Sequence, residues 1–596
     1  MILVIAFIII IFSAILSKKR NENEWYSIED VERLEQILNH NCNEDGGYHE
    51  ILNTDLYKGD LLYFTYYSLL TFEKMDYPYE KVNKILKGTV KNIFIDSFIK
   101  ENYFDNLSNI YYFVGITKML NVDIDERNIS FIREYVSNLQ TKEGCFALSE
   151  KQKQKINNAQ YKDGEYNETF LATFMALDIL RQVEYEKYDE EKLNTWIKNK
   201  FEALKSSTNY NELPYIMLLV KIDNIIGYTG NEHMELLAKY YDLSLDYLKA
   251  DYDENKSFDI FFMNDVLETS ILLDRSASFL DETVYMINYY SSLQDDNDGC
   301  FGADKQSLSN ILPTFCTAVY YNLAGIKLPK QEKIVETIRS CQTIEGYFLP
   351  IMERASDLES TYYTYKIFAL INSKCDYEDK IKRFLRNQKI SDIRQEQSEL
   401  LFYYRLNDEI YGKNELCDVS RDLISKLKET LRENDLSNYY LASQAIYSLE
   451  TLNLFDEHID NETYEKLVKQ IEERNGVVNG DYLFTCYDLL ILKLLGYNNA
   501  DGVIERKSEI IKGTLFNDYR EIEQDLRLFY LYWGIQSLNS WGIEFIELAD
   551  KGAIVEDVLE HKRSAVFSLG TEDYPSLSST YYCLYIMQNI KNKQSK

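Results

Sequence analysis

The side chains in this sequence that could do chemistry are mostly tyrosines, which number 50 in a chain of 596 residues. A tyrosine offers an apolar ring face and a polar hydroxyl tip, which suits an apolar ligand or an extended peptide. An aromatic stripe at helical spacing is also what a helical core needs, so only some of these rings are free for a ligand. We expect Tyr362, Tyr363 and Tyr581 to bind a ligand at the mouth of a helical barrel. Adjacent pairs occur at Tyr111-Tyr112, Tyr362-Tyr363, Tyr439-Tyr440 and Tyr581-Tyr582.

Other reactive groups are few. The run Asp295–Asp298 precedes Gly299, a pattern typical of a solvated turn. Histidine, cysteine and aspartate side chains that could ligate a metal cluster in the loop over 40–49, where an ordinary polar loop is the interpretation. The nine cysteines include no Cys-x-x-Cys pair, which favours reduced thiols in a reducing compartment. The sequence therefore indicates no cofactor and no metal site, and it leaves the catalytic residues unknown.

Helices must position these side chains, because apolar residues recur with helical periodicity and strand alternation is hard to find. Two segments align without a gap. Gly299 and Gly346 are 47 residues apart, and each is followed 15 residues later by a threonine, Thr314 or Thr361, that begins an aromatic run. A repeat of this length indicates an array of helical hairpins.

The aromatic helix recurs along the chain and predicts twelve hairpins, six before and six after a linker near 325–330. Six hairpins can close into an α/α barrel. The sequence therefore predicts an all-α fold of two tandem α/α toroids, at 25–325 and 330–590. An open solenoid of the HEAT or armadillo kind is the alternative, since helical pairs of about 40–47 residues also describe those arrays. The predicted starts of the aromatic helices are Leu61, Leu107, Thr169, Pro214, Asp265, Thr314, Thr361, Glu399, Ser437, Tyr482, Leu528 and Ser579.

Residues 1–17 are almost entirely apolar, and a basic cluster, Lys18–Arg20, follows at once. This order favours a single-pass transmembrane signal anchor with a cytoplasmic body, because positive charge flanks the cytoplasmic side of a span. An atypical signal sequence with an extracellular body is the alternative. The formal net charge of −32 excludes nucleic acid as an expected partner, since phosphate binding needs a basic surface.

The loops resemble those of the prenyltransferase and squalene-cyclase repeat superfamily, the α/α toroids. Glutamine, acidic residues, glycine and an aromatic residue recur at 140–146, 294–301 and 342–348, each before an aromatic helix. The resemblance implies a membrane-associated toroid related to terpene cyclases and protein prenyltransferases. Its catalytic motifs are absent: the segment 313–318 resembles the end of the cyclase Asp-x-Asp-Asp motif without its acids, and the chain has no zinc-binding Asp-x-Cys.

Two functions follow as hypotheses. The first is a membrane-anchored, terpene-cyclase-like or prenyltransferase-like toroid that binds an isoprenoid, another lipid or a similar apolar ligand, with or without catalysis. In terpene cyclases aromatic walls stabilise cations through their ring faces. The alternative is a non-catalytic scaffold that holds a peptide or a protein partner at the membrane.

Overall fold

The computed structural model describes most of the chain after residue 26. Residues 1–26, which include the apolar segment 1–17, lie outside the described residues. Across the described segments, no helix is both long enough and apolar enough to cross a membrane. The described segments are 27–43, 47–48, 58–78, 83–95, 106–160, 163–185, 187–227, 230–343, 346–351, 356–371, 373, 378–388, 397–412, 421–474, 482–498, 502–517, 522, 524–543, 551–563, 566–568 and 576–591.

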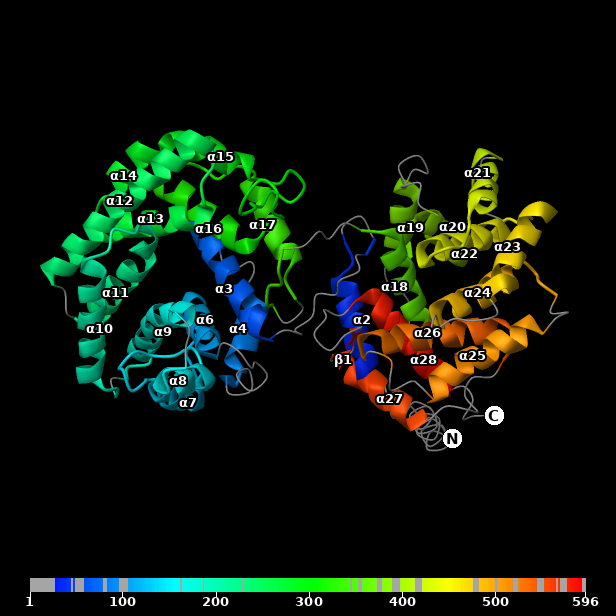
Figure 1. The fold of residues 1–596 in the computed structure, drawn as a ribbon, viewed down its shortest axis with the longest axis horizontal. Coiled ribbons are helices and arrows are strands. Elements are labelled where there is room, and N and C mark those ends of the chain that lie inside the picture. Colours follow the sequence, from blue (N-terminus) through cyan, green and yellow to red (C-terminus); the bar gives the residue numbers. More distant parts are fainter. Residues whose placement is uncertain are drawn as a thin grey trace, which may run out of the picture. The chain divides into compact units, whose positions relative to one another are not determined.

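The chain forms two compact units (Figure 1). One unit is Tyr57–Glu353, and the other combines Met1–Leu56 with Arg354–Lys596. The predicted division into 25–325 and 330–590 does not coincide with these units. The helix after the predicted linker belongs to the first unit, and the N-terminal helix belongs to the second.

Six helices of the unit Tyr57–Glu353 contact one another in cyclic order, until the last contacts the first again. We call this set ring A. Its colours run from blue at α3 to green at α16 in Figure 1. The all-α toroid class predicted from the sequence is confirmed, and the open solenoid is excluded for this unit by the contact of α16 with α3. Ring A consists of α3 (Lys58–Lys74), α6 (Asn106–Met119), α9 (Asp163–Gln182), α11 (Leu213–Ile226), α13 (Ile260–Leu272) and α16 (Ile311–Leu323).

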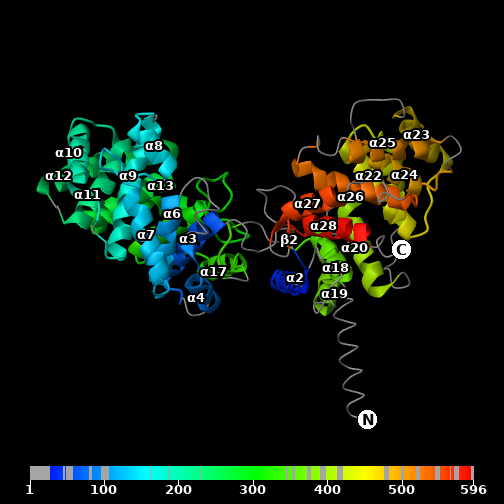
Figure 2. The ribbon, with the colours of Figure 1, turned by 90° about the horizontal axis from the view of Figure 1, so that it is seen from below.

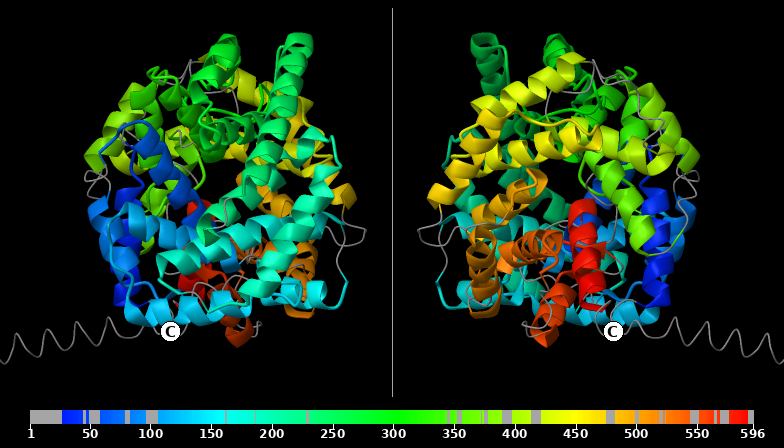
Figure 3. Two further views of the ribbon diagram at one scale, coloured as in Figure 1. Left: turned by 90° about the vertical axis from the view of Figure 1, so that its left-hand side faces the viewer. Right: turned by 90° about the vertical axis from the view of Figure 1, so that its right-hand side faces the viewer.

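A second cyclic set, ring B, forms the core of the other unit, with α28 in contact with α18. Several of its helices lie side by side in Figure 2, and the helices of each unit follow one another around a circle in Figure 3. Each of the twelve predicted aromatic helices corresponds to one member of ring A or ring B. Ring B consists of α18 (Leu358–Leu370), α20 (Gln397–Tyr411), α22 (Tyr439–Leu454), α24 (Tyr482–Leu494), α26 (Gln524–Ser540) and α28 (Leu577–Lys591).

Outer helices surround both rings, and their sequences show why. An inner helix such as α24, YLFTCYDLLILKL, is apolar on nearly every side, whereas the outer α19, EDKIKRFLRN, buries one narrow stripe. The outer helices are α2 (Ile28–His40), α4 (Asn83–Lys91), α7 (Glu126–Asn138), α8 (Glu150–Asn157), α10 (Glu190–Lys205), α12 (Asn231–Asn255), α14 (Ser276–Thr283), α15 (Ile287–Ser292), α17 (Gln331–Ser340), α19 (Glu378–Asn387), α21 (Arg421–Glu433), α23 (Asn461–Glu473), α25 (Val503–Asn517) and α27 (Lys551–Glu560). Short elements are the 3-10 turns η2 (Tyr210–Glu212) and η3 (Val284–Met286), and a two-stranded hairpin, β1 (Lys562–Arg563) with β2 (Val566–Phe567).

A recurring hydrogen bond fixes each repeat loop on an inner helix. The aromatic residue of the loop donates its backbone N–H to the hydroxyl of a buried threonine on the helix. Thr173, Thr314 and Thr361 in turn donate their hydroxyls to the backbone carbonyl four residues earlier, as Thr314 does to Asn310 at 2.7 Å. The pairs are Phe146 with Thr173, Phe301 with Thr314, Phe348 with Thr65 and Tyr48 with Thr361, each at 3.0 Å, and Phe567 with Thr580 at 3.1 Å.

Two of these bonds explain the division of the chain. The loop after α17 places Phe348 on Thr65 of α3, not on the α18 helix that follows it in sequence. The loop after α2 places Tyr48 on Thr361 of α18, not on α3. Each ring is therefore completed by a loop that directly precedes the first helix of the other ring in the sequence. For this reason the two units do not separate near 325–330.

Candidate functional site

The structure brings the sequence-predicted tyrosines together inside ring B. Tyr362 and Tyr363 lie on α18, and Tyr581 lies on α28, the helix that closes the ring. The ring centroids of Tyr363 and Tyr581 are 5.1 Å apart, and the hydroxyl oxygens of Tyr363 and Tyr582 are 3.4 Å apart. Adjacent tyrosines on these two helices thus form one aromatic surface.

The aromatic surface extends to the other inner helices of ring B. The sequence predicted these helices but did not single out the aromatic side chains that they contribute. Phe402 of α20 contacts Tyr362 at 5.4 Å, and Tyr447 of α22 contacts Phe402 at 6.3 Å between centroids. On the other side, Tyr532 of α26 stacks on Tyr582 at 4.1 Å. Tyr487 of α24 joins the same set through Trp533 of α26, at 5.0 Å between centroids. All six inner helices therefore contribute rings to one connected wall.

Ion pairs lie against this wall. Lys366 of α18 pairs with Glu409 of α20, and its ammonium nitrogen is 5.9 Å from the ring centroid of Tyr362. Arg405 of α20 pairs with Glu450 of α22, and the guanidinium carbon lies 5.5 Å from the ring centroid of Tyr362. Burial raises the pKa of the Glu450 carboxyl, and Arg405 opposes that rise. Both side chains keep partial exposure, 28% for Arg405 and 22% for Glu450, so water reaches them among the rings. The charges of Arg405 and Glu450 compensate each other.

The hydroxyls of Tyr363, Tyr447 and Tyr532 in ring B stay protonated over the physiological range. Burial raises the pKa of Tyr363 and of Tyr532 well above the ordinary value for a phenol. Burial and the nearby carboxyls of Glu359 and Glu450 raise the pKa of Tyr447 to about 12, against the effect of Arg405. These hydroxyls are therefore neutral hydrogen-bond donors set in an aromatic surface.

Ring A has a comparable aromatic interior. Tyr67 of α3 contacts Phe315 of α16 at 5.4 Å, and Tyr66 contacts Tyr111 of α6 at 5.9 Å between centroids. Tyr111 in turn contacts Phe174 of α9 at 6.3 Å. Aromatic side chains from four adjacent inner helices thus meet inside this ring as well.

The acidic residue that sequence reasoning missed is Asp265, on α13 of ring A. Burial and the neighbouring Glu268 raise its pKa to about 7, while Lys221 of α11 acts in the opposite direction. Lys221 forms its ion pair with Glu268, at 2.6 Å, and not with the neighbouring carboxyl of Asp265. Its negative charge also acts on the Cys316 thiol of α16. The signal in the sequence was a pair of carboxyls one turn apart in an otherwise apolar helix.

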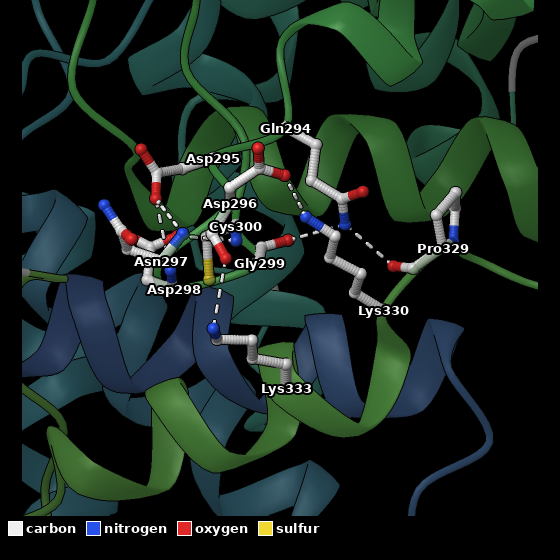
Figure 4. A network of polar contacts seen from close by, with 10 residues as sticks. All are labelled: Gln294, Asp295, Asp296, Asn297, Asp298, Gly299, Cys300, Pro329, Lys330 and Lys333. Carbon is white, nitrogen blue, oxygen red and sulfur yellow. Dashed lines mark hydrogen bonds and ion pairs between the residues drawn. The ribbon is translucent and has the colours of Figure 1, made fainter.

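The acidic run Asp295–Asp298 serves its own turn, as the sequence indicated. Asp295 Oδ1 accepts from the backbone N–H groups of Asn297 at 2.6 Å and Asp298 at 3.1 Å. Asp296 pairs with Lys330 at the start of α17 (Figure 4). Gln294 donates to the carbonyls of Gly299 at 2.7 Å and of Pro329 at 2.8 Å (Figure 4). The motif therefore holds one repeat loop against the next outer helix.

The repeat glycines allow the loops to approach so closely. Gly144 and Gly346 have φ of +101° and +94°, in the left-handed region. A Cβ on Gly144 would lie 2.3 Å from the backbone of Lys192, and a Cβ on Gly346 would lie 2.6 Å from the backbone of Leu86. A side chain at either position would separate the loop from the neighbouring outer helix.

Among the described residues, no three His, Cys, Asp or Glu side chains are grouped so that they could hold a metal ion. Asp45 and His49 of the loop over 40–49 lie outside the described residues. The thiols of Cys145 and Cys300, which follow repeat glycines, are buried, and burial raises their pKa. They are turn anchors and not activated nucleophiles.

The comparison with protein families agrees with this architecture. The model of the prenyltransferase alpha-alpha toroid domain matches residues 86–211, 231–395 and 508–596, which together cover more than half of the chain. The chain belongs to this toroid family. No curated protein matches the sequence. The matched ranges include parts of both rings of the toroid protein, in agreement with their common design.

The toroid protein places no acid where the cyclase motif would stand. The segment 313–318 lies on α16, and its Thr314 hydroxyl is occupied by the repeat loop. Asp265 belongs to the neighbouring helix α13. Family membership therefore gives the fold, and the interiors of the two rings must supply the argument on function.

Proposed function

We propose that this toroid protein binds an apolar ligand, an isoprenoid or another lipid, inside ring B. The observation that carries the proposal is the connected aromatic wall formed by Tyr363, Tyr581, Tyr532 and their neighbours on the inner helices. Ring faces of this kind bury apolar chains and also attract positive charge. Neutral tyrosine hydroxyls and the Arg405–Glu450 pair supply a few polar contacts for orientation.

We further propose that each ring derives from six helical hairpins of about 47 residues and that residues 1–17 anchor the protein in a membrane. The basic residues 18–20 support a cytoplasmic body. An anchor would keep the rings near a lipid ligand. Membrane fractionation of the full chain, compared with a chain lacking residues 1–17, tests the anchor: if both stay soluble, the anchor is wrong.

Acid chemistry in ring A is a second candidate function, favoured by Asp265. A carboxyl whose pKa stands at about 7 is partly protonated at neutral pH and can donate a proton. The aromatic interior around Tyr67 and Phe315 would shield a positive charge formed on the ligand. If this activity exists, Asp265→Asn abolishes turnover, and Asp265→Glu restores part of it.

Native mass spectrometry of the detergent-extracted full-length protein tests ligand binding. The expected result is a bound isoprenoid or lipid of defined mass, which is lost in Tyr363→Ala and in Tyr581→Ala. Tyr440→Ala is the matched control, because Tyr440 is a tyrosine of ring B that is 66% exposed. Retention of the ligand in all three variants would refute the ring B site. A stoichiometric peptide or protein in place of a lipid would support the scaffold function.

A further inference from the structure

Ring A contains a pocket of about 450 Å³, lined by α3, α6 and α9 near their C-terminal ends. The lining residues sit on helix faces that stay partly exposed, whereas residues on the opposite sides of these helices, such as Thr71 and Ala176, are fully buried. The pocket therefore opens on the inner side of the ring and not toward the outer helices.

A glycine shapes the aromatic side of this pocket. A Cβ on Gly115 of α6 would lie 2.4 Å from the ring of Tyr66, so only glycine lets this ring lie against the α6 backbone. Tyr66 and Tyr111 then stand with their rings 5.9 Å apart. Burial raises the pKa of both hydroxyls, which remain neutral donors.

The rim of the pocket is polar, and its carboxylates are already paired. Asp178 accepts from Gln182 at 2.8 Å and from Arg181 at 2.6 Å. Glu73 pairs with the adjacent Lys74 at 3.2 Å. Lys118 of α6 adds a positive charge to the lining. Such a rim offers both donors and acceptors but no uncompensated negative charge, which suits a head group that forms hydrogen bonds and is not cationic.

The same inner faces become aromatic toward the other end of the helices. Tyr63 and Tyr67 of α3 stand one to three turns before Glu73, and Tyr67 packs on Phe315 of α16 at 5.4 Å. The separation of ten residues between Tyr63 and Glu73 corresponds to about 15 Å along a helix. Polar and apolar contacts are thus separated along the ring axis.

We propose that ring A binds an amphiphile without positive charge, such as a long-chain alcohol, with its hydrogen-bonding head in the pocket beside Tyr66 and Asp178 and its chain along Tyr67 and Phe315. The inference rests on the proposed function, since it assumes that ring interiors of this toroid accept apolar chains. It adds a second ligand position, the class of ligand and the direction in which the ligand lies.

Photoaffinity labelling of the full-length protein tests the direction. Two derivatives of tetradecanol carry a diazirine, one beside the hydroxyl carbon and one at the far end of the chain. The head-labelled probe is expected to modify residues 115–119 and 178–182, and the tail-labelled probe residues 63–67 and Phe315. Labelling of the same peptides by both probes, the reverse pattern, or no labelling of ring A would overturn the proposal.

Two glycine variants provide a matched comparison. Gly115→Ala forces Tyr66 from its place and is expected to weaken head labelling about tenfold, which is equivalent to about 1.4 kcal/mol. Gly88→Ala on α4 is the control, because nothing lies within 4 Å of a Cβ there. Equal labelling of the two variants would overturn the proposal. If Gly115→Ala does not fold, Gln182→Leu takes its place, with the same expectation for the alcohol.

Competition with tetradecane separates this inference from the proposed function. The alcohol is expected to displace the probe from ring A much better than the hydrocarbon does. Equal competition would refute recognition of the head group and leave apolar binding intact. Loss of ligand from ring B, followed by native mass spectrometry, reports on the proposed function independently.

Discussion

Replacing Asp265 by asparagine is expected to stabilise the unit Tyr57–Glu353 at alkaline pH. The carboxyl has a pKa of about 7 in the folded protein, against 3.8 for an unperturbed aspartate. Folding must therefore keep this group protonated, or bury its charge next to Glu268. Asparagine has nearly the same shape as the protonated acid and never carries the charge.

The magnitude follows from linkage. The folded state binds the proton more tightly than the unfolded state, so the free energy of unfolding falls as pH rises from about 4 to about 7 and is then constant. A difference of roughly three pKa units at 1.36 kcal/mol each gives about 4 kcal/mol. Because the Asp265 side chain is partly exposed, this is an upper bound. It corresponds to a rise in Tm of roughly 5–10 °C for a unit of this size.

Differential scanning calorimetry of the wild type and Asp265→Asn at pH 4.5, 6, 7 and 8, chosen around the pKa of about 7, measures the effect. The difference in Tm is expected to be smallest at the lowest pH and to grow until pH exceeds the folded pKa. Glu268→Gln is the control with the opposite sign, because it leaves Lys221 without its partner. A Tm difference for Asp265→Asn that does not change with pH would refute the reasoning.

Three further outcomes are expected. Asp488→Asn should lower the free energy of unfolding by about 3–5 kcal/mol, because Lys507, whose side chain is 3% exposed, loses the carboxylate it contacts at 2.8 Å. A loss below about 1 kcal/mol in urea unfolding, which is typical of a surface ion pair, would contradict this. Thr314→Val leaves the backbone N–H of Phe301 without its acceptor, and equilibrium unfolding should show a loss of about 1–3 kcal/mol. A fragment 57–353 should unfold cooperatively on heating, and a fragment 25–325 should not, since it lacks α17 and its loop; equal cooperativity of the two fragments would refute the exchange of loops.

Several features could be predicted from the sequence because they depend on local chemistry. The start of each inner helix follows from apolar periodicity and capping, as Asn310 and Asp357 show by accepting from backbone N–H groups of α16 and α18. The repeat glycines and the turn around Asp295–Asp298 follow from the conformational needs of tight turns. Tyr363 and Tyr581 could be selected as neighbours only through the expected closure of the ring.

The tertiary structure decided the rest, and the reason is that the repeats are chemically alike. A loop ending in Phe348 or Tyr48 fits a buried threonine on any inner helix, so the sequence does not say whether it binds the next helix or a distant one. Ring closure makes that choice, and it gives the α17 loop to Thr65 and the α2 loop to Thr361. Asp265 is a similar case. Its sequence neighbourhood is that of an apolar helix, and only burial beside Glu268, with Lys221 already paired, makes it an unusual acid.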